Sequence, residues 1–217
     1  MSWYFPESAL EKFFPRHVVQ SHQRNRLIYQ TDGPSDVLYW VKKGIVELRC
    51  PYNQGRSFLA RLVAPNELFG FEEIDVAGDS TQLFEARAWT NCELVMVTKE
   101  RVLRALQSLD SATLTSVITH INKAWAHQAH YWASFVLMDC RERLACVLAD
   151  LARRFGAQEK RGVMIVLSLT HQDLSEMVGF SRALTSRVLA EMVDEGTIVV
   201  EQNHFLIPHE SSLLTSR

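Results

Sequence analysis

The stretch LTHQDLSEMVGFSRALTSRVLAEMVDEG, residues 169–196, contains two short amphipathic segments that meet at Val178-Gly179-Phe180. Thr170 is a suitable cap for the first segment, with Asp173 in place of the Glu usually found three positions after the cap. Gly179 permits a sharp turn, and Ser181 can cap the second segment. The spacing therefore predicts two helices joined by a tight turn, the geometry of a helix-turn-helix.

The second segment is predicted to leave small and basic side chains on its outer face. Its inward residues are expected to be Leu184, Val188, Leu189 and Met192, and its outward ones Arg182, Ala183, Thr185, Ser186 and Arg187. In a helix-turn-helix, the start of the second helix contacts base edges, and arginine can bind guanine bidentately. A plain helical hairpin, the alternative, has no need for such a face. The predicted DNA-binding residues are these five outward positions together with Thr170, His171, Gln172 and Ser181.

The overall charge gives no support to nucleic-acid binding. Residues 1–138 carry 14 basic and 14 acidic side chains, and residues 139–217 carry 9 and 11. A local basic face can nevertheless attract phosphate. A solvated helix face is the alternative for the basic residues that precede the helix-turn-helix, namely Arg141, Arg143, Arg153, Arg154, Lys160 and Arg161.

From about residue 26 to residue 98 the chain consists of short β segments. LIYQ, DVLYWVKKG, IVELRC, SFLARLVA, LFEARAW and CELVMVT are rich in aliphatic and aromatic residues. Turn residues separate them at 32–34, 53–55 and 77–79, and Lys43-Gly44 and Asn53-Gln54-Gly55 are predicted hairpin turns. Many short strands at this spacing predict a sandwich or barrel.

A long helix is predicted between these two regions, over residues 110–137. Its apolar stripe alternates steps of four and three, as in a helix that pairs with another. At 1.5 Å per residue the helix is roughly 40 Å long, more than one face of a small β domain can cover. We therefore expect a parallel homodimer, with covering of the β domain as the alternative. The predicted dimerisation residues are Leu114, Ile118, Ile121, Trp125, Gln128, Trp132 and Phe135.

Asp139 is expected to end this helix and to cap the next, CRERLACVLADLARRFG, which Gly156 ends in a left-handed conformation. A loop containing QEKRG and an apolar strand, VMIVLSL, follow. TIVVEQNHFLIP is predicted to form two strands around Gln202-Asn203, a β wing beside the helices. The predicted domains are a β domain over 1–109, a dimerisation helix over 110–138 and a winged helix-turn-helix over 139–217, an α+β fold.

This order of elements resembles the cyclic-AMP receptor protein and FNR superfamily of bacterial transcription regulators. The resemblance covers nearly the whole chain and is most specific in LTHQDLSEMVGFSR with its following RVL, in LYWVKKGIVEL and in ELFGF. It implies a double-stranded β-helix (jelly-roll) effector domain, a homodimer that binds two-fold symmetric double-stranded DNA, and RNA polymerase as a partner. Two recognition helices about one DNA turn apart are compatible with a net charge of -2.

The nucleotide-binding residues of the cyclic-AMP-binding relatives are changed in this chain. The resemblance implies Gly-Glu followed later by Arg-Ser, but the chain has Gly70-Phe71, with Glu72 behind, and then Gln82-Leu83. A buried cyclic phosphate needs a charge partner, which additional carboxylates do not supply. Gln128-Ala129 replaces the Thr-Ser pair that touches adenine. We expect no tight cyclic-nucleotide binding and an unidentified effector, with candidate residues Phe69, Gly70, Phe71, Glu72, Gln82, Leu83, Arg87, Trp125 and Gln128.

The recognition segment also departs from the resemblance. Relatives commonly have Glu directly after the Ser-Arg pair, where it accepts a hydrogen bond from cytosine, whereas this chain has Ala183. Loss of that acceptor removes roughly 1–3 kcal/mol of discrimination at one base pair. The half-site is therefore expected to differ from the one usual in the family.

Other classes of protein fit the sequence less well. A cupin-type metal enzyme needs several histidines on its strands, but residues 23–119 contain none. A helix-turn-helix that binds a protein partner remains the alternative to DNA binding. The sequence predicts neither a catalytic nor a metal site, no resident cofactor, and free buried thiols at the four cysteines, Cys50, Cys92, Cys140 and Cys146. Because no run approaches the roughly 20 apolar residues of a membrane span, a cytoplasmic protein is expected.

Overall fold

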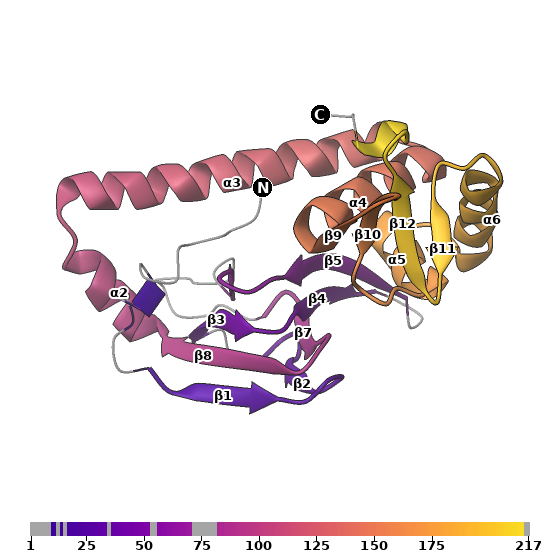
Figure 1. Cartoon of the computed structure of the whole chain (residues 1–217). Coiled ribbons are helices and arrows are strands. Elements are labelled where there is room, and N and C mark those ends of the chain that lie inside the picture. The colour runs from indigo at the N-terminus through magenta and orange to yellow at the C-terminus, as the bar shows by residue number, and fades with distance from the viewer. Residues whose placement is uncertain are drawn as a thin grey trace. The chain divides into compact units, whose positions relative to one another are not determined.

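The computed structural model of the chain describes residues 10, 11, 14, 17–33, 36–52, 56–70 and 82–214. In the long helix α3 (Ser111–Leu137) it describes the whole backbone, and all side chains but those of residues 120, 123, 124, 127, 128, 130, 131 and 134. The chain divides into two compact units, Met1–His130 and Tyr131–Arg217. The boundary lies inside α3, which continues through it (Figure 1).

The first unit contains two antiparallel sheets of four strands each within the described residues (Figure 1). One sheet has the order β1-β8-β3-β6, formed by Val19–His22, Cys92–Thr98, Val37–Lys43 and Leu68–Phe69. The other has the order β2-β7-β4-β5, formed by Leu27–Tyr29, Glu85–Ala88, Val46–Pro51 and Ser57–Val63. The predicted jelly-roll domain is confirmed, and the short strands β1 and β6 are additions to it.

The core of this unit lies between the two sheets. Tyr39, Val41, Phe69 and Leu94 of the first sheet pack against Val46, Leu48, Val63, Ala86 and Ala88 of the second. The rings of Tyr39 and Phe69 stack with their centroids 4.8 Å apart. Alternate residues of β3, Leu38 and Trp40, pack on the other face, against Val102 of helix α2 (Lys99–Gln107). Burial on both faces explains why β3 is a nearly continuous apolar run.

The prediction of a hairpin at Lys43-Gly44 was wrong. β3 and β4 belong to different sheets, so this turn passes from one sheet to the other. The left-handed backbone expected of the glycine is present, with φ at 82°. The Gly44 backbone also lies close to the Asn91 carbonyl and to Cys92, where no Cβ fits. The predicted turn residues 53–55 and 77–79 lie outside the described residues, although β4 and β5 pair as neighbours.

The close approach at Gly44 predicts a loss of stability on substitution. Gly44→Ala should lower the free energy of unfolding by about 2–4 kcal/mol, because left-handed strain and overpacking both apply. Gly196 is a matched control, because its φ is 71° but an added Cβ has nothing within 4 Å. Gly196→Ala should cost about 1–2 kcal/mol from strain alone. Urea denaturation followed by circular dichroism measures both, and equal losses would contradict the packing argument.

Helix α3 confirms the helix predicted over residues 110–137. It begins after Asp110, whose carboxylate accepts hydrogen bonds from the Thr113 amide (2.9 Å) and the Thr113 hydroxyl (2.7 Å). These bonds from Thr113 lower the pKa of the Asp110 carboxyl. Among the described helices, α3 included, none is long and apolar enough to cross a membrane.

The second unit combines helices with a four-stranded antiparallel sheet of order β11-β12-β10-β9. Its helices are α4 (Cys140–Phe155), α5 (His171–Val178) and α6 (Arg182–Asp194), with a short 3-10 helix at Ser212–Leu214. Its strands are β9 (Gly156–Glu159), β10 (Gly162–Ile165), β11 (Val199–Glu201) and β12 (His204–Pro208). The predicted wing is confirmed as β11 and β12, joined at Gln202 and Asn203, which both have positive φ (Figure 1).

Two predictions about the end of α4 were wrong. Gly156 is extended (φ −91°, ψ 144°) and not left-handed. Gln158 and Glu159, which belong to the predicted loop QEKRG, form the second half of β9 and pair with β10. A Cβ at Gly156 would collide with the Ala152 carbonyl and with Val163. The glycine is therefore required because helix and strand approach closely there, and not because of its backbone angles.

Candidate nucleic-acid interface

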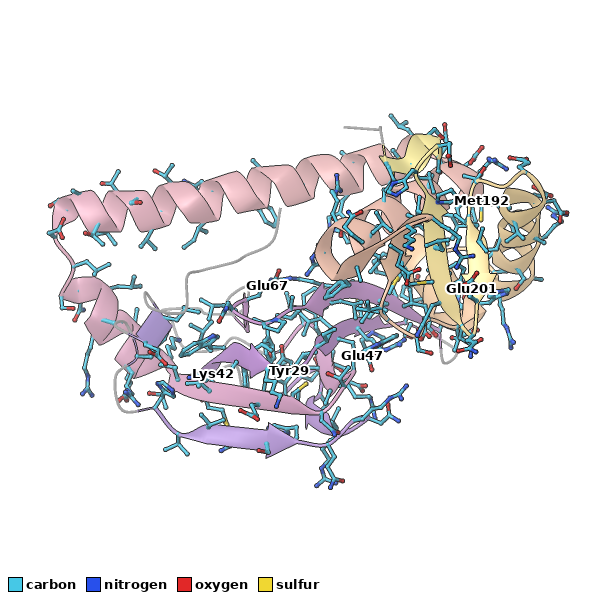
Figure 2. The ribbon with its side chains drawn as sticks, viewed as in Figure 1. Tyr29, Lys42, Glu47, Glu67, Met192 and Glu201 are labelled. Atoms are coloured by element: carbon cyan, nitrogen blue, oxygen red, sulfur yellow. The ribbon has the colours of Figure 1, made fainter. Side chains whose placement is uncertain are left out.

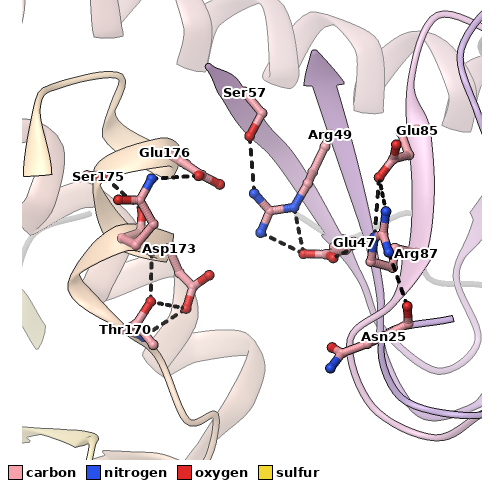
Figure 3. A network of polar contacts seen from close by, with 11 residues as sticks. Asn25, Glu47, Arg49, Ser57, Glu85, Arg87, Thr170, Asp173, Ser175 and Glu176 are labelled. Atoms are coloured by element: carbon pink, nitrogen blue, oxygen red, sulfur yellow. Dashed lines mark hydrogen bonds and ion pairs between the residues drawn. The ribbon is translucent and has the colours of Figure 1, made fainter. Parts of the chain in front are cut away.

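Local capping sets the bounds of α5 and α6, as predicted. Thr170 and Asp173 form a capping box at the start of α5, in which the Thr170 amide donates to the Asp173 carboxylate at 2.8 Å (Figure 3). Gly179 ends α5 in the left-handed region, with φ at 74°. The Ser181 hydroxyl accepts a hydrogen bond from the Leu184 amide and caps α6. The start of each helix is therefore satisfied by a side chain, and α5 ends at a glycine in the turn.

The buried face of α6 differs by one position from the predicted one. Val188, Leu189 and Met192 are buried, as expected, and Met192 is labelled in Figure 2. Thr185 is also fully buried, at 0% exposure, whereas Leu184 is only half-buried. The prediction that Thr185 faces outward was therefore wrong. Residues 185, 188, 189 and 192 share one face of a helix with about 3.6 residues per turn. Cys140, the first residue of α4, lies beside Thr185 on this face.

The exposed face at the start of α6 carries Arg182, Ala183 and Arg187. The Arg187 side chain is 71% exposed, and its nearest carboxylate oxygen, on Glu191 of the same helix, lies 4.0 Å away. Exposed pairs of this kind contribute little, so the guanidinium remains available to another partner. Ala183 beside the two arginines leaves room for close approach to that partner.

The predicted contacts from α5 are placed beside this face. Thr170, Gln172 and Ser181 are exposed. His171 Nδ1 and Ser186 Oγ share a hydrogen bond of 2.8 Å, which joins the first turn of α5 to α6. Both side chains are half-buried. Among the predicted residues, the structure therefore joins His171 to Ser186 directly and leaves Thr170, Gln172, Ser181, Arg182, Ala183 and Arg187 exposed.

The predicted basic face before the helix-turn-helix is largely neutralised by carboxylates. Arg153 and Arg154 pair with Asp150 of their own helix, and Arg141 pairs with Glu195. Arg161 makes two hydrogen bonds with Glu201 of the wing, at 2.7 and 2.8 Å, and the Arg161 guanidinium lowers the pKa of the Glu201 carboxyl. Of these pairs, only those of Arg141 and Arg161 join different elements of the second unit, and the exposed arginines of α6 are kept as its candidate DNA contacts.

The predicted effector residues that the structure describes lie in different surroundings. Phe69 is fully buried in the core, and Gly70 takes φ 78° beside the Val37 carbonyl. Gln82 is buried, and its backbone N–H donates to the Gly33 carbonyl at 2.9 Å, while Leu83 is 61% exposed. Phe71 and Glu72 lie outside the described residues, as does the side chain of Gln128. Trp125 is 66% exposed on α3.

Arg87 lies on the outer face of its sheet. Ala86 and Ala88 on either side of it belong to the core, so Arg87 points the opposite way. Its guanidinium donates to Glu85 at 2.8 Å and lies 3.9 Å from Glu47, its cross-strand neighbour (Figure 3). Arg49 completes this network by donating to Glu47 at 2.9 Å. The Arg87 guanidinium therefore pairs with carboxylates on the outer face of its sheet and does not point between the two sheets.

Glu67 is a structural residue whose role the sequence did not reveal. The Glu67 side chain, labelled in Figure 2, is 1% exposed. It accepts hydrogen bonds from Arg61 at 3.1 Å and from the Ala64 amide at 3.3 Å. A buried carboxylate needs such partners. It therefore fixes the turn before β6, in the ELFGF segment.

The cysteines are only partly as predicted. All four are free thiols, and Cys92 and Cys140 are buried, but Cys50 is exposed near the end of β4 and Cys146 is half-buried. Burial raises the pKa of the Cys140 thiol. No group of three His, Cys, Asp or Glu side chains in the described parts of the chain is arranged to bind a metal ion.

The predicted dimerisation stripe is exposed in part. Ile118 is 49% and Trp125 66% exposed, while Leu114, Ile121 and Trp132 are half-buried. Phe135 is 4% exposed, because it packs edge-on against Trp132 and beneath the Arg143 guanidinium. The prediction that Phe135 faces a partner was therefore wrong, since its own chain covers it.

Both units match known families. The cyclic nucleotide-binding domain matches residues 19–108, and the Crp-like helix-turn-helix domain matches residues 142–215. The global nitrogen regulator of Nostoc sp. is 25% identical over 203 residues, covering 94% of this chain and 90% of the regulator. The CRP-like cAMP-activated global transcriptional regulator of Mycobacterium tuberculosis is 26% identical over 191 residues, covering 88% and 84%.

Solved structures share the fold over more than nine-tenths of the chain. The c-di-GMP-responsive global regulator CLP of Xanthomonas campestris superposes with a TM-score of 0.76 at 19% identity, covering 94% of this chain and 99% of that one. FixK2 from Bradyrhizobium japonicum gives 0.72 at 18% identity, covering 92% and 96%. With both domains matched in the same order as in these regulators, the chain belongs to the CRP/FNR family of transcription regulators.

Proposed function

We propose that the protein is a homodimeric, sequence-specific DNA-binding regulator of transcription, with α6 as its recognition helix. The observation that carries the proposal is the exposed pair Arg182 and Arg187, with Ala183 between them, at the start of a helix whose other face is buried. Arginines in this position reach base edges in the major groove, and small neighbours allow the helix to approach.

Dimerisation is supported by the apolar side chains on α3. Ile118 and Trp125 are seven residues apart, two helical turns, and are 49% and 66% exposed in the single chain. Exposed apolar stripes on long helices mark interaction surfaces. A two-fold axis along α3 gives each dimer two copies of α6, as a palindromic site requires. We propose residues 1–109, 110–138 and 139–217 as the effector domain, dimerisation helix and DNA-binding domain.

We propose that the β domain, which matches a cyclic nucleotide-binding domain, binds a small-molecule effector other than cyclic AMP. Leu83 is exposed where relatives that bind the nucleotide have the serine of an Arg-Ser pair, and Arg87 is already bound to two carboxylates. Relatives named as cAMP-activated and as c-di-GMP-responsive show that the fold accepts different effectors. The relatives are regulators and not enzymes, and we propose the same here, acting in the cytoplasm on RNA polymerase.

Selection of DNA sequences tests the proposal directly. The purified full-length protein is incubated with duplexes carrying randomised inverted half-sites, and retained duplexes are amplified and sequenced. We expect a palindrome with half-site centres about 10 base pairs apart, bound more weakly as salt rises. Failure to enrich any sequence, with retention independent of salt, would instead support the protein-interaction alternative.

A further inference from the structure

The first turn of α4 contacts the turn before α6 and the residue that directly follows α6. Arg143 lies against the turn that precedes α6, and Arg141 pairs with Glu195, the residue that ends α6. Between them, Cys140 lies beside Thr185, in the buried face of α6. This turn directly follows Met138 and Asp139, where α3 ends and α4 begins. Arg141 and Arg143 belong to the basic residues that the sequence predicted as a possible phosphate-binding face. Their contacts indicate instead that they connect α4 to the residues on either side of α6.

Arg143 joins the end of α3 to the turn of the helix-turn-helix. Its Nε donates to the Met138 carbonyl at 3.2 Å, and one Nη donates to the Val178 carbonyl at 2.9 Å. Met138 follows the last residue of α3, and Val178 is the last residue of α5. The negative ends of both helix dipoles are therefore bound by one guanidinium.

Two aromatic rings complete the Arg143 site. The guanidinium carbon lies 5.3 Å from the centroid of Phe135, on α3, and 4.7 Å from that of Phe180, directly before the cap of α6. A planar, delocalised cation suits such stacking, whereas an ammonium group does not reproduce it. Phe135 is thereby used within the chain, which explains its burial although it lies on the stripe of α3.

We propose that Arg143 is a positioning residue that fixes the orientation of α6 relative to the end of α3. This role rests on the proposed function, because the orientation of α6 relative to α3 affects the binding of a palindrome only when α3 pairs with a second copy. If α3 sets the dimer axis, the distance and rotation between the two recognition helices depend on how firmly each α6 is held against its α3. Arg143 itself contacts no DNA in this arrangement and acts through Phe180 and Val178.

The dependence of affinity on half-site spacing reports this role. One added base pair moves a half-site by about 3.4 Å along the duplex and rotates it by about 35°. Two firmly held helices tolerate little of that change, whereas loosely held helices adapt to it. A residue that contributes only to stability would lower the melting temperature without changing the spacing preference of the folded dimer.

The experiment compares the wild type with Arg143→Met on the selected palindrome. Spacing is varied by about two base pairs on either side of the optimum, and a duplex with one half-site is included. We expect Arg143→Met to bind the optimal duplex about tenfold more weakly or worse. Its affinity should fall less than that of the wild type when the spacing changes, and single half-site binding should change less than binding to the palindrome. Arg143→Lys should be intermediate, since it keeps the charge and loses the stacking.

Arg104→Met is the matched control. It removes one exposed arginine of an ion pair with Glu100, on α2, and should leave the spacing profile unchanged. If Arg143→Met does not fold, Phe180→Leu removes one stacking ring and should flatten the profile in the same direction. Folded, dimeric Arg143→Met or Phe180→Leu with the wild-type spacing profile would overturn the inference. If the wild type binds no duplex at all, the proposed function fails, and the inference with it.

Discussion

Replacement of Arg182 and Arg187 by alanine is expected to remove sequence-specific DNA binding. A bidentate arginine–guanine contact contributes about 1–3 kcal/mol of discrimination, and each substitution occurs twice in a homodimer. The loss should therefore be about 2–6 kcal/mol of binding free energy for each position that contacts a base. Because the Arg187 side chain is 71% exposed and only weakly paired, its replacement should have little effect on folding.

Gel-shift titrations of the selected palindrome at several salt concentrations measure this effect. A position that contacts a base should relax the preference there, whereas a position that contacts phosphate should weaken all duplexes and reduce the salt dependence. Arg104→Ala is a matched control, because Arg104 pairs with Glu100 four residues away as Arg187 does with Glu191. If both single variants bound every duplex like the wild type, α6 would not be the recognition helix.

The elements that could be predicted from the sequence are those specified by local signals. Thr170 and Ser181 each accept a hydrogen bond from an amide three residues on, and the Gly179 amide donates to a carbonyl four residues back, so the starts of α5 and α6 and the end of α5 follow from composition and spacing. Helix α3 could be predicted equally well, because its apolar residues recur at alternating steps of four and three. At Gly44 the sequence predicted the left-handed backbone of the turn. It did not predict to which sheet the next strand, β4, belongs. Strand pairing is decided by contacts distant in the sequence.

The site was predictable to the same extent. Helical periodicity predicted the exposed positions of α6 except Thr185. Thr185 is buried next to Cys140 of α4, a contact between two helices that the local sequence pattern does not predict. Arg143 could not be separated from the other arginines, since its partners are carbonyl groups and rings contributed by other elements. Burial of a polar group depends on its partners, and these are known only once the chain is folded.

The second large effect is expected on α3. Trp125→Asp should convert the dimer into single subunits, because a large apolar side chain that is 66% exposed in one chain is replaced by a charge at the proposed interface. Burial of an apolar side chain of this size contributes about 1.5–3 kcal/mol, and the substitution removes it from both subunits. The dimer dissociation constant should therefore rise by at least about 100-fold. Sedimentation velocity over a range of protein concentrations measures it.

Tyr52→Asp is the matched control for this prediction. Tyr52 is also an aromatic residue with 66% exposure, but it follows β4 and lies off α3, with its ring beneath Arg56. Its replacement should leave the mass of the particle unchanged. Trp125→Asp should lose binding to the palindrome and retain weak binding to a single half-site, because each α6 stays intact while the second copy is absent. A Trp125→Asp protein that remains a dimer, together with a dimeric Ile118→Asp, would place the interface elsewhere and leave the exposed stripe of α3 without the role assigned to it.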